Sequence, residues 1–170
     1  LREPETSLDR ANLVVITKGD QVSEESLTKT KAQLKEINPN LDIIITKHQP
    51  TYLRNLTTEQ HQAIDLNNKR VVVVSGIGKP RSFELTIENL GAQIVKKIRY
   101  QDHHSYTEDE INRLFTLATV HNVDKIITTE KDAVKLNQKQ LSIFKDFNLD
   151  VFSLKVKVNI DNETALLDII

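Results

Sequence analysis

Short runs of apolar, mostly β-branched residues alternate with stretches of helical pattern along this chain, and this alternation limits the fold more than any other feature. The apolar runs are residues 13–17, 42–46, 71–74, 93–98, 124–128 and 150–154. The helical patterns cover approximately residues 24–37, 80–90, 107–118, 131–145 and 162–170. Strands and helices that alternate in this way are typical of α/β proteins. We therefore predict an α/β fold with a mostly parallel, Rossmann-like sheet and helices on both faces.

Local signals indicate where several of these elements begin and end. Residues 71–74 are all valine, as expected for a central strand that is covered on both faces. The helix after it should begin at Pro80, a favoured first-turn residue, and end at Gly91. Residues 107–110 match a capping box that opens the next helix. Residues 47–68 show no clean period, and we interpret them as a connecting excursion that could include a hairpin linker.

Composition excludes several classes of protein. The formal net charge is -1 over 170 residues, so there is no overall basic field that would attract nucleic acid. The chain has no cysteine, which excludes disulfides and thiolate metal sites. No apolar run approaches the roughly 20 residues that span a bilayer, so we expect any membrane contact to be peripheral. Because the chain begins with Leu1 and has no methionine, we interpret it as a fragment of a longer polypeptide.

Three of the predicted strands run into polar signatures. These signatures are Gly76-Ile77-Gly78-Lys79-Pro80, Asp102-His103-His104 and Thr128-Thr129-Glu130-Lys131-Asp132. In an open α/β sheet, the ligand crevice forms at the carboxyl ends of the strands. If the three strands are parallel neighbours, the three signatures meet at that edge and form one site.

The first signature has the glycines of an anion-binding turn between a strand and a helix. Such a turn lets backbone amides approach a phosphate at the helix N-terminus. However, Val73 and Pro80 break the P-loop pattern Gly-x-x-x-x-Gly-Lys-Ser/Thr, and Arg81 breaks the dinucleotide pattern Gly-x-Gly-x-x-Gly. The alternative is a tight turn at Gly76 and Gly78 that binds no ligand.

The second signature offers a candidate for proton transfer. A histidine with an ordinary pKa of about 6.5 can accept a proton near neutral pH. Asp102 precedes His103 directly, but neighbours on an extended chain point in opposite directions, so the two side chains need not touch. The same geometry argues against His103 and His104 binding one metal ion. The alternative is a loop histidine that caps or packs under the following helix.

The third signature and the start of the chain offer groups for phosphate. Lys131 could neutralise a phosphate, and Thr129 or Glu130 could position a substrate group. The alternative is an N-capped helix with a solvated charge run that includes Asp132. Arg2 could bind phosphate in bidentate fashion, or it belongs to a polar leader.

Five motifs, in this order, resemble the second half of the tetraacyldisaccharide 4'-kinase family, the lipid A 4'-kinases of Gram-negative bacteria. They are Leu-Arg-Glu-Pro followed by Leu-x-Arg-Ala (1–11), Gly-Ile-Gly-x-Pro-x-x-Phe (76–83), Leu-Gly-Ala (90–92), Asp-His (102–103) and Thr-Glu-Lys-Asp-Ala-Val-Lys (129–135). The resemblance runs from residue 1 to about residue 136, and no other family known to us combines these motifs.

The resemblance implies that residues 1–170 are the C-terminal lobe of a two-lobed kinase, with 47–68 as a connecting segment. Such an enzyme uses ATP and Mg²⁺ to phosphorylate the 4'-hydroxyl of an acylated glucosamine disaccharide, tetraacyldisaccharide 1-phosphate. It works as a peripheral protein at the cytoplasmic face of the inner membrane. Its P-loop lies in the N-terminal lobe, which is thus the implied partner of this chain, and no nucleic acid is involved.

The resemblance also implies roles for individual residues. His103, with Asp102, would be the general base or part of a dyad that activates the sugar hydroxyl, whereas His104 would be structural. In the family, this histidine pairs with a carboxylate of the N-terminal lobe. The residues that would bind substrate or phosphate, or support the cleft, are Arg2, Gly76, Gly78, Thr129, Glu130, Lys131 and Asp132.

The sequence departs from the complete family in one respect. It contains no Gly-x-x-x-x-Gly-Lys-Ser/Thr, so the main ligands of ATP and Mg²⁺ are missing and we expect this chain alone to be inactive. Two alternatives stay open. The chain could be a Rossmann-like module that binds a nucleotide or phosphosugar at the turn 76–78, or an interaction domain in which all three signatures are only caps and turns.

Overall fold

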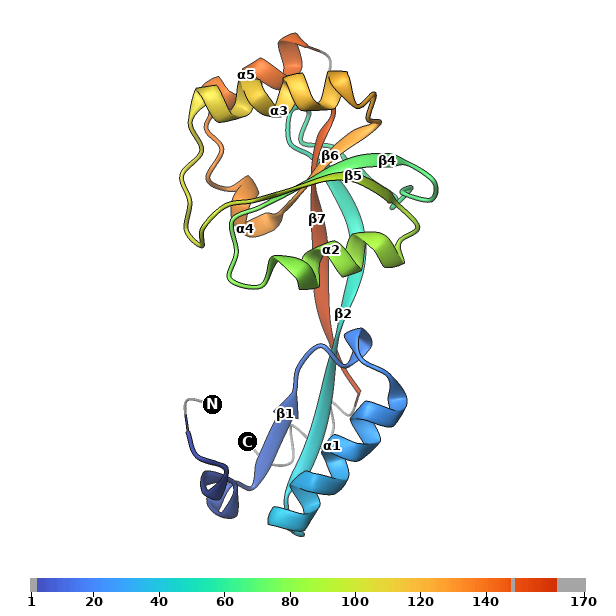
Figure 1. Cartoon of the computed structure of the whole chain (residues 1–170), viewed down its shortest axis with the longest axis vertical. Coiled ribbons are helices and arrows are strands. Elements are labelled where there is room, and N and C mark those ends of the chain that lie inside the picture. The colour runs from blue at the N-terminus through green and yellow to red at the C-terminus, as the bar shows by residue number, and fades with distance from the viewer. Residues whose placement is uncertain (1–2, 148, 162–170) are drawn as a thin grey trace. The chain divides into compact units, whose positions relative to one another are not determined.

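The computed structural model describes residues 3–147 and 149–161. Figure 1 labels most of the helices and strands, and its colours follow the chain from the N-terminus to the C-terminus. In chain order, the elements are η1 (Glu5–Arg10), β1 (Leu13–Ile16), η2 (Gly19–Gln21), α1 (Glu24–Ile37), β2 (Asp42–Asn55), β3 (His61–Gln62), β4 (Arg70–Ser75), α2 (Pro80–Asn89), β5 (Gln93–Arg99), α3 (Glu108–Val120), β6 (Lys125–Thr129), α4 (Glu130–Ala133), α5 (Gln138–Asp146) and β7 (Val151–Ile160).

The chain divides into two compact units. Unit 1 comprises Leu1–Gln49 and Lys157–Ile170, and unit 2 comprises Pro50–Val156. The strands β2 and β7 each begin in one unit and end in the other. The interpretation of the whole chain as one lobe of a larger enzyme stays a prediction.

Unit 2 contains a parallel sheet in which β4 lies in the middle. These strands lie in the order β7-β6-β4-β5 within the longer strand order β1-β2-β7-β6-β4-β5, in which β3 pairs with β2. β4 is parallel to both β5 and β6. Val74 pairs with Thr128 on one side, and Ser75 pairs with Arg99 on the other. The three strands that precede the polar signatures are therefore parallel neighbours, and their carboxyl ends meet at one edge of the sheet.

Both faces of this sheet are covered, because successive side chains of β4 point to opposite sides. Val71 and Val73 pack in the cluster that contains Ile87 of α2. Val72 and Val74 pack in the other cluster, with the core residues of α3 and α5. Figure 1 shows α2 on one side of the sheet and α3 and α5 on the other. The predicted fold class is thus confirmed.

The predicted helix boundaries follow from local chemistry. The side chain of Ser23 accepts a hydrogen bond from Ser26 N–H at the start of α1, and Thr107 forms a reciprocal capping box with Glu110 at the start of α3. Pro80 opens α2. Gly91 has a φ of 83°, the left-handed conformation that commonly ends a helix.

Three boundaries differ from the sequence prediction. The strand predicted over 42–46 continues through Pro50 to Asn55 and pairs antiparallel with β3, so the excursion 47–68 begins as a strand and a short hairpin. The helix predicted over 131–145 is two helices, because the Asn137 side chain caps a new helix at Gln138. The last strand extends to Ile160. The short helix predicted for 162–170 lies outside the described residues.

Unit 1 repeats the β-α-β pattern on a smaller scale. β1 and β2 are parallel, with Val14 opposite Ile43, and α1 connects them. The Asn38 side chain donates to the carbonyls of Leu8 and Ala11, which fixes the end of α1 against the segment before β1. Within the residues described in either unit, no helix is long and apolar enough to cross a membrane.

Candidate functional site

Three loops follow the carboxyl ends of β4, β5 and β6 and meet at one edge of unit 2. We call them the strand-end loops. Residues 76–79 and 100–107 form the first two, and residues 129–132, the end of β6 with the first turn of α4, form the third. All the predicted site residues except Arg2 lie in these loops, whereas Arg2 lies outside the described residues. The parallel topology therefore brings the three polar signatures together, as predicted.

Asp132 connects two of these loops from a fully buried position. Its Oδ2 accepts the Gly76 backbone N–H at 3.0 Å and the Thr129 hydroxyl at 2.7 Å. Its Oδ1 accepts Lys135 Nζ at 2.8 Å. The Asp132 N–H in turn donates to Thr129 Oγ1 at 3.1 Å, which caps α4. Since both oxygens are satisfied, this carboxylate fastens the loop after β4 to the loop after β6.

The charge of this buried carboxylate is maintained by its partners. Burial opposes ionisation, but Lys135, the Thr129 hydroxyl and the Gly76 amide outweigh it, so the pKa of Asp132 lies below its ordinary value. Burial raises the pKa of the neighbouring Tyr106 far above its usual range, and the negative charge of Asp132 adds to this effect. Asp132 is therefore ionised at neutral pH and acts as an internal anion.

This internal anion explains the glycine at position 76. A Cβ at Gly76 would lie 3.0 Å from Asp132 Oδ1 and 3.2 Å from the Gln101 carbonyl oxygen. A side chain at position 76 would therefore have to displace these neighbouring groups. The amide that could approach a phosphate already donates to Asp132. The contacts with Asp132 and Gln101 are thus sufficient to explain why glycine occupies position 76, without a bound phosphate. Gly78 lies beside the second signature, with its Cβ position 3.6 Å from Asp102 Oδ2.

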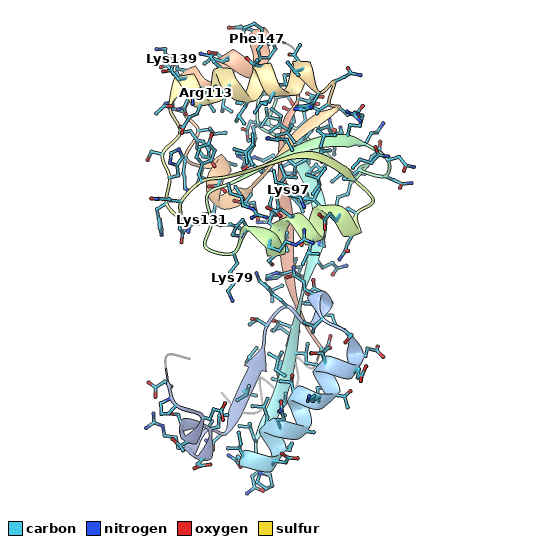
Figure 2. The ribbon with its side chains drawn as sticks, viewed as in Figure 1. Lys79, Lys97, Arg113, Lys131, Lys139 and Phe147 are labelled. Carbon is cyan, nitrogen blue, oxygen red and sulfur yellow. The ribbon has the colours of Figure 1, made fainter. Side chains whose placement is uncertain are left out.

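Asp102 is bound by groups from two loops. Its Oδ1 accepts Lys131 Nζ at 2.6 Å and the His103 backbone N–H at 3.0 Å. Its Oδ2 lies 3.9 Å from His103 Nε2. The hydrogen bond from Lys131 is the main reason why the pKa of Asp102 lies below its ordinary value. Figure 2 labels Lys131 on α4.

His103 adopts an unusual backbone conformation for a residue with a side chain. Its φ is 63°, in the left-handed region, and its side chain is 79% exposed. This turn of the backbone brings its ring to the same side as the Asp102 carboxylate, although neighbours on an extended strand would point apart. An exposed imidazole beside a carboxylate can accept a proton from a substrate and stabilise the imidazolium that results.

His104 has a different environment from its neighbour. Its ring stacks on Tyr100, with centroids 4.3 Å apart, and its Nε2 lies 3.0 Å from a carboxylate oxygen of Glu110 in α3. His104 therefore fits the alternative of a loop histidine that supports the following helix. Only His103 keeps its ring toward solvent.

A family model described as tetraacyldisaccharide-1-P 4'-kinase matches residues 1–170. The chain belongs to the tetraacyldisaccharide-1-P 4'-kinase family. A tetraacyldisaccharide 4'-kinase of Halothermothrix orenii is 30% identical over 180 residues, which cover 100% of this chain and 47% of the relative. One of Elusimicrobium minutum is 32% identical over 158 residues, covering 93% and 41%. The chain thus spans about half the length of these curated relatives.

A solved structure is also similar to this chain. It is LpxK from Aquifex aeolicus, described as an "apo" form in complex with ATP. The two share 20% sequence identity with a TM-score of 0.49, over 93% of this chain and 50% of the other.

In this member of the tetraacyldisaccharide-1-P 4'-kinase family, two of the predicted site residues form ion pairs with other side chains of the chain. Glu130 Oε1 accepts Lys155 Nζ at 2.8 Å, so it faces β7, and Lys131 is occupied by Asp102. Sequence reasoning gave no role to Lys135, which binds Asp132. Its spacing of three residues from Asp132 on one helical turn was the available signal. Across the described ranges, no three potential metal ligands converge.

Proposed function

We propose that this chain is the C-terminal part of a tetraacyldisaccharide 4'-kinase. The complete enzyme would transfer the γ-phosphate of ATP to the 4'-hydroxyl of tetraacyldisaccharide 1-phosphate in lipid A biosynthesis, at the inner membrane surface. Family membership supports the reaction. The observation that carries the assignment of a site is the exposed His103, turned toward the Asp102 carboxylate at the carboxyl edge of the sheet.

In this proposal His103 is the general base. Its neutral imidazole would accept the proton of the sugar hydroxyl as the hydroxyl oxygen attacks the phosphoryl group. The Asp102 carboxylate, 3.9 Å from the ring nitrogen, would stabilise the imidazolium until the proton leaves. General-base catalysis of this kind contributes about 10²- to 10⁴-fold to a rate. Most of the remaining acceleration in phosphoryl transfer comes from positioning and charge neutralisation.

The residues of this chain do not fit the phosphates of ATP. The sequence has no P-loop pattern, and the one glycine turn that resembles an anion site has its Gly76 amide bonded to Asp132. We therefore propose that ATP and Mg²⁺ are held by a P-loop lobe of the same enzyme. Residues 1–170 alone should neither phosphorylate the lipid nor bind ATP or NADP tightly. Turnover by the isolated chain, or tight binding of either nucleotide at the turn 76–78, would contradict this assignment.

The test of the general base is His103→Ala in the full-length enzyme of which this chain is a part. The expected result is a fall in kcat of about 10²- to 10⁴-fold with little change in KM or in folding. The matched control is His121→Ala, which removes an imidazole from the end of α3 in the same unit. Wild-type turnover in His103→Ala would rule out His103 as the general base. It would favour the alternative in which this chain is an interaction domain without a site.

A further inference from the structure

The strand-end loops contain an ion pair that the general-base role does not explain. Lys131 Nζ lies 2.6 Å from Asp102 Oδ1 and joins the loop after β6 to the loop after β5, across 29 positions of sequence. A lysine that served only to attract phosphate would gain nothing from a carboxylate partner. The pair is also 45% and 42% exposed, and an ion pair this open to water contributes little to stability.

The two oxygens of Asp102 serve different parts of His103. Oδ1, which Lys131 binds, also accepts the backbone N–H of His103 at 3.0 Å. Oδ2 faces the ring, 3.9 Å from Nε2. The orientation of one carboxylate is thus linked to both the backbone and the imidazole of His103. A left-handed φ in a residue other than glycine costs free energy and persists only where surrounding contacts maintain it.

Lys131 is well placed to orient this carboxylate, because its own backbone is anchored. The next residue in the chain is the buried Asp132, which is fixed by Gly76, Thr129 and Lys135. The adjacent residues Lys131 and Asp132 therefore link all three strand-end loops. Asp132 binds the loop after β4, and Lys131 binds the loop after β5.

We infer that Lys131 is a positioning residue, which orients the Asp102 carboxylate and thereby holds His103 in its left-handed conformation with the ring turned to the substrate side. This inference rests on the proposed role of His103 as general base. Lys131 also offsets the negative charge beside the imidazole.

The test replaces Lys131 and compares the result with a matched exposed pair. Lys131→Gln removes the ammonium group but keeps a polar side chain of similar length. Lys155→Gln is the control, because its 2.8 Å pair with the neighbouring Glu130 is 43% and 45% exposed, nearly the same as the Lys131 pair. Lys131→Arg is the conservative variant that should restore the pairing.

The first measurement is NMR titration of the 170-residue chain. In Lys131→Gln, the pKa of Asp102 should rise toward its ordinary value, because the Lys131 hydrogen bond is the main cause of its depression. The backbone couplings of His103 should change from a single left-handed conformation to an average. Lys155→Gln and Lys131→Arg should resemble the wild type. Identical spectra at Asp102 and His103 in Lys131→Gln would overturn the inference.

The second measurement is kinetics of the full-length enzyme. Lys131→Gln should lower kcat about tenfold with KM for ATP unchanged, since a base that is misplaced by a small distance loses rate rather than affinity. Lys131→Arg should restore kcat, because arginine can donate the same hydrogen bond to Asp102, and such a rescue is not expected if Lys131 acts only through general stability. Wild-type kcat in Lys131→Gln would refute the positioning role. If His103→Ala keeps wild-type turnover, the general-base proposal fails instead, and the NMR arm still decides whether Lys131 orients Asp102.

Discussion

The two units of this chain use the same β-α-β pattern but bury very different fractions of it. In unit 2, the four valines of β4 are all buried, because helices cover both faces of the sheet. In unit 1, by contrast, none of the fourteen residues of α1 is buried. None of the four residues of β1 is buried either, and Val15 is 44% exposed.

The difference shows that two units with the same order of strands and helices can differ in how firmly their elements are held by burial. A strand buried on both faces has little freedom to move, so the loops at its end start from fixed positions. All the described candidate site residues lie in unit 2. The geometry of the candidate site is therefore a property of unit 2 and its core. Two comparisons of matched substitutions in the two units, and one measurement of the pH dependence of unit 2, test this conclusion.

The largest effect is expected from shortening an isoleucine in the helix of each unit. Ile87 of α2 is 0% exposed, whereas Ile37 of α1 is 36% exposed. Ile87→Ala should destabilise unit 2 by about 2 to 5 kcal/mol, because it removes buried methyl groups and leaves a cavity. Ile37→Ala should cost less than about 1 kcal/mol, since water already reaches that side chain.

Urea unfolding measures the two changes separately. All three tyrosines lie in unit 2 and the chain has no tryptophan, so tyrosine fluorescence reports unit 2 alone. Amide hydrogen exchange of α1 and β1 reports unit 1. Equal losses of unfolding free energy in Ile87→Ala and Ile37→Ala would mean that unit 1 buries its helix as well as unit 2 does. That result would contradict the difference in burial between the two units.

An intermediate effect is expected from neutralising one ion-paired aspartate in each unit. Asp132 is fully buried and pairs with Lys135, whereas Asp161 pairs with Lys47 at 3.2 Å and is 41% exposed. Asp132→Asn should cost about 3 kcal/mol, because it leaves a lysine and several donors without their anion. Asp161→Asn should cost less than about 1 kcal/mol. A small loss in Asp132→Asn would show that the strand-end loops are held by something other than this carboxylate.

The order of elements was predictable from the sequence because the signals were local. The four valines at 71–74 and the capping box at Thr107 each lie within one element. The extension of β2 was missed because the residues beyond Thr46 are mostly polar and include Pro50, so the apolar run does not continue to the end of the strand. The break between α4 and α5 was missed because Asn137 caps from within a stretch that otherwise has a helical period.

The candidate site was predictable in its location but not in its connections. Parallel topology alone brings the three signatures to one edge. The bond from Gly76 to Asp132 spans 56 positions and the one from Lys131 to Asp102 spans 29, and no sequence pattern encodes such partners. The division of roles between His103 and His104 depends on one left-handed residue, which the triplet Asp-His-His does not reveal.

The smallest of the three effects is expected under acid. The pKa values of five carboxyl groups in unit 2 lie below their ordinary values because cations or hydrogen-bond donors stabilise the ionised form, and these groups are Glu84, Glu88, Asp102, Glu110 and Asp132. A lowered pKa in the folded state adds stability above the unfolded-state pKa, about 4 for such groups. That stability is lost as the pH falls further, through the folded-state values.

We therefore expect the unfolding free energy of unit 2, followed by tyrosine fluorescence in urea, to decrease as the pH falls from about 5 to 3. Asp132→Asn supplies the internal control, because it lacks the buried group that must be protonated. The difference in stability between the wild type and this variant should shrink with decreasing pH as Asp132 itself becomes neutral. A difference that stays constant down to pH values of about 3 would mean that the charge of Asp132 does not stabilise the fold. The cost of Asp132→Asn at neutral pH would then come from the lost hydrogen-bond geometry alone.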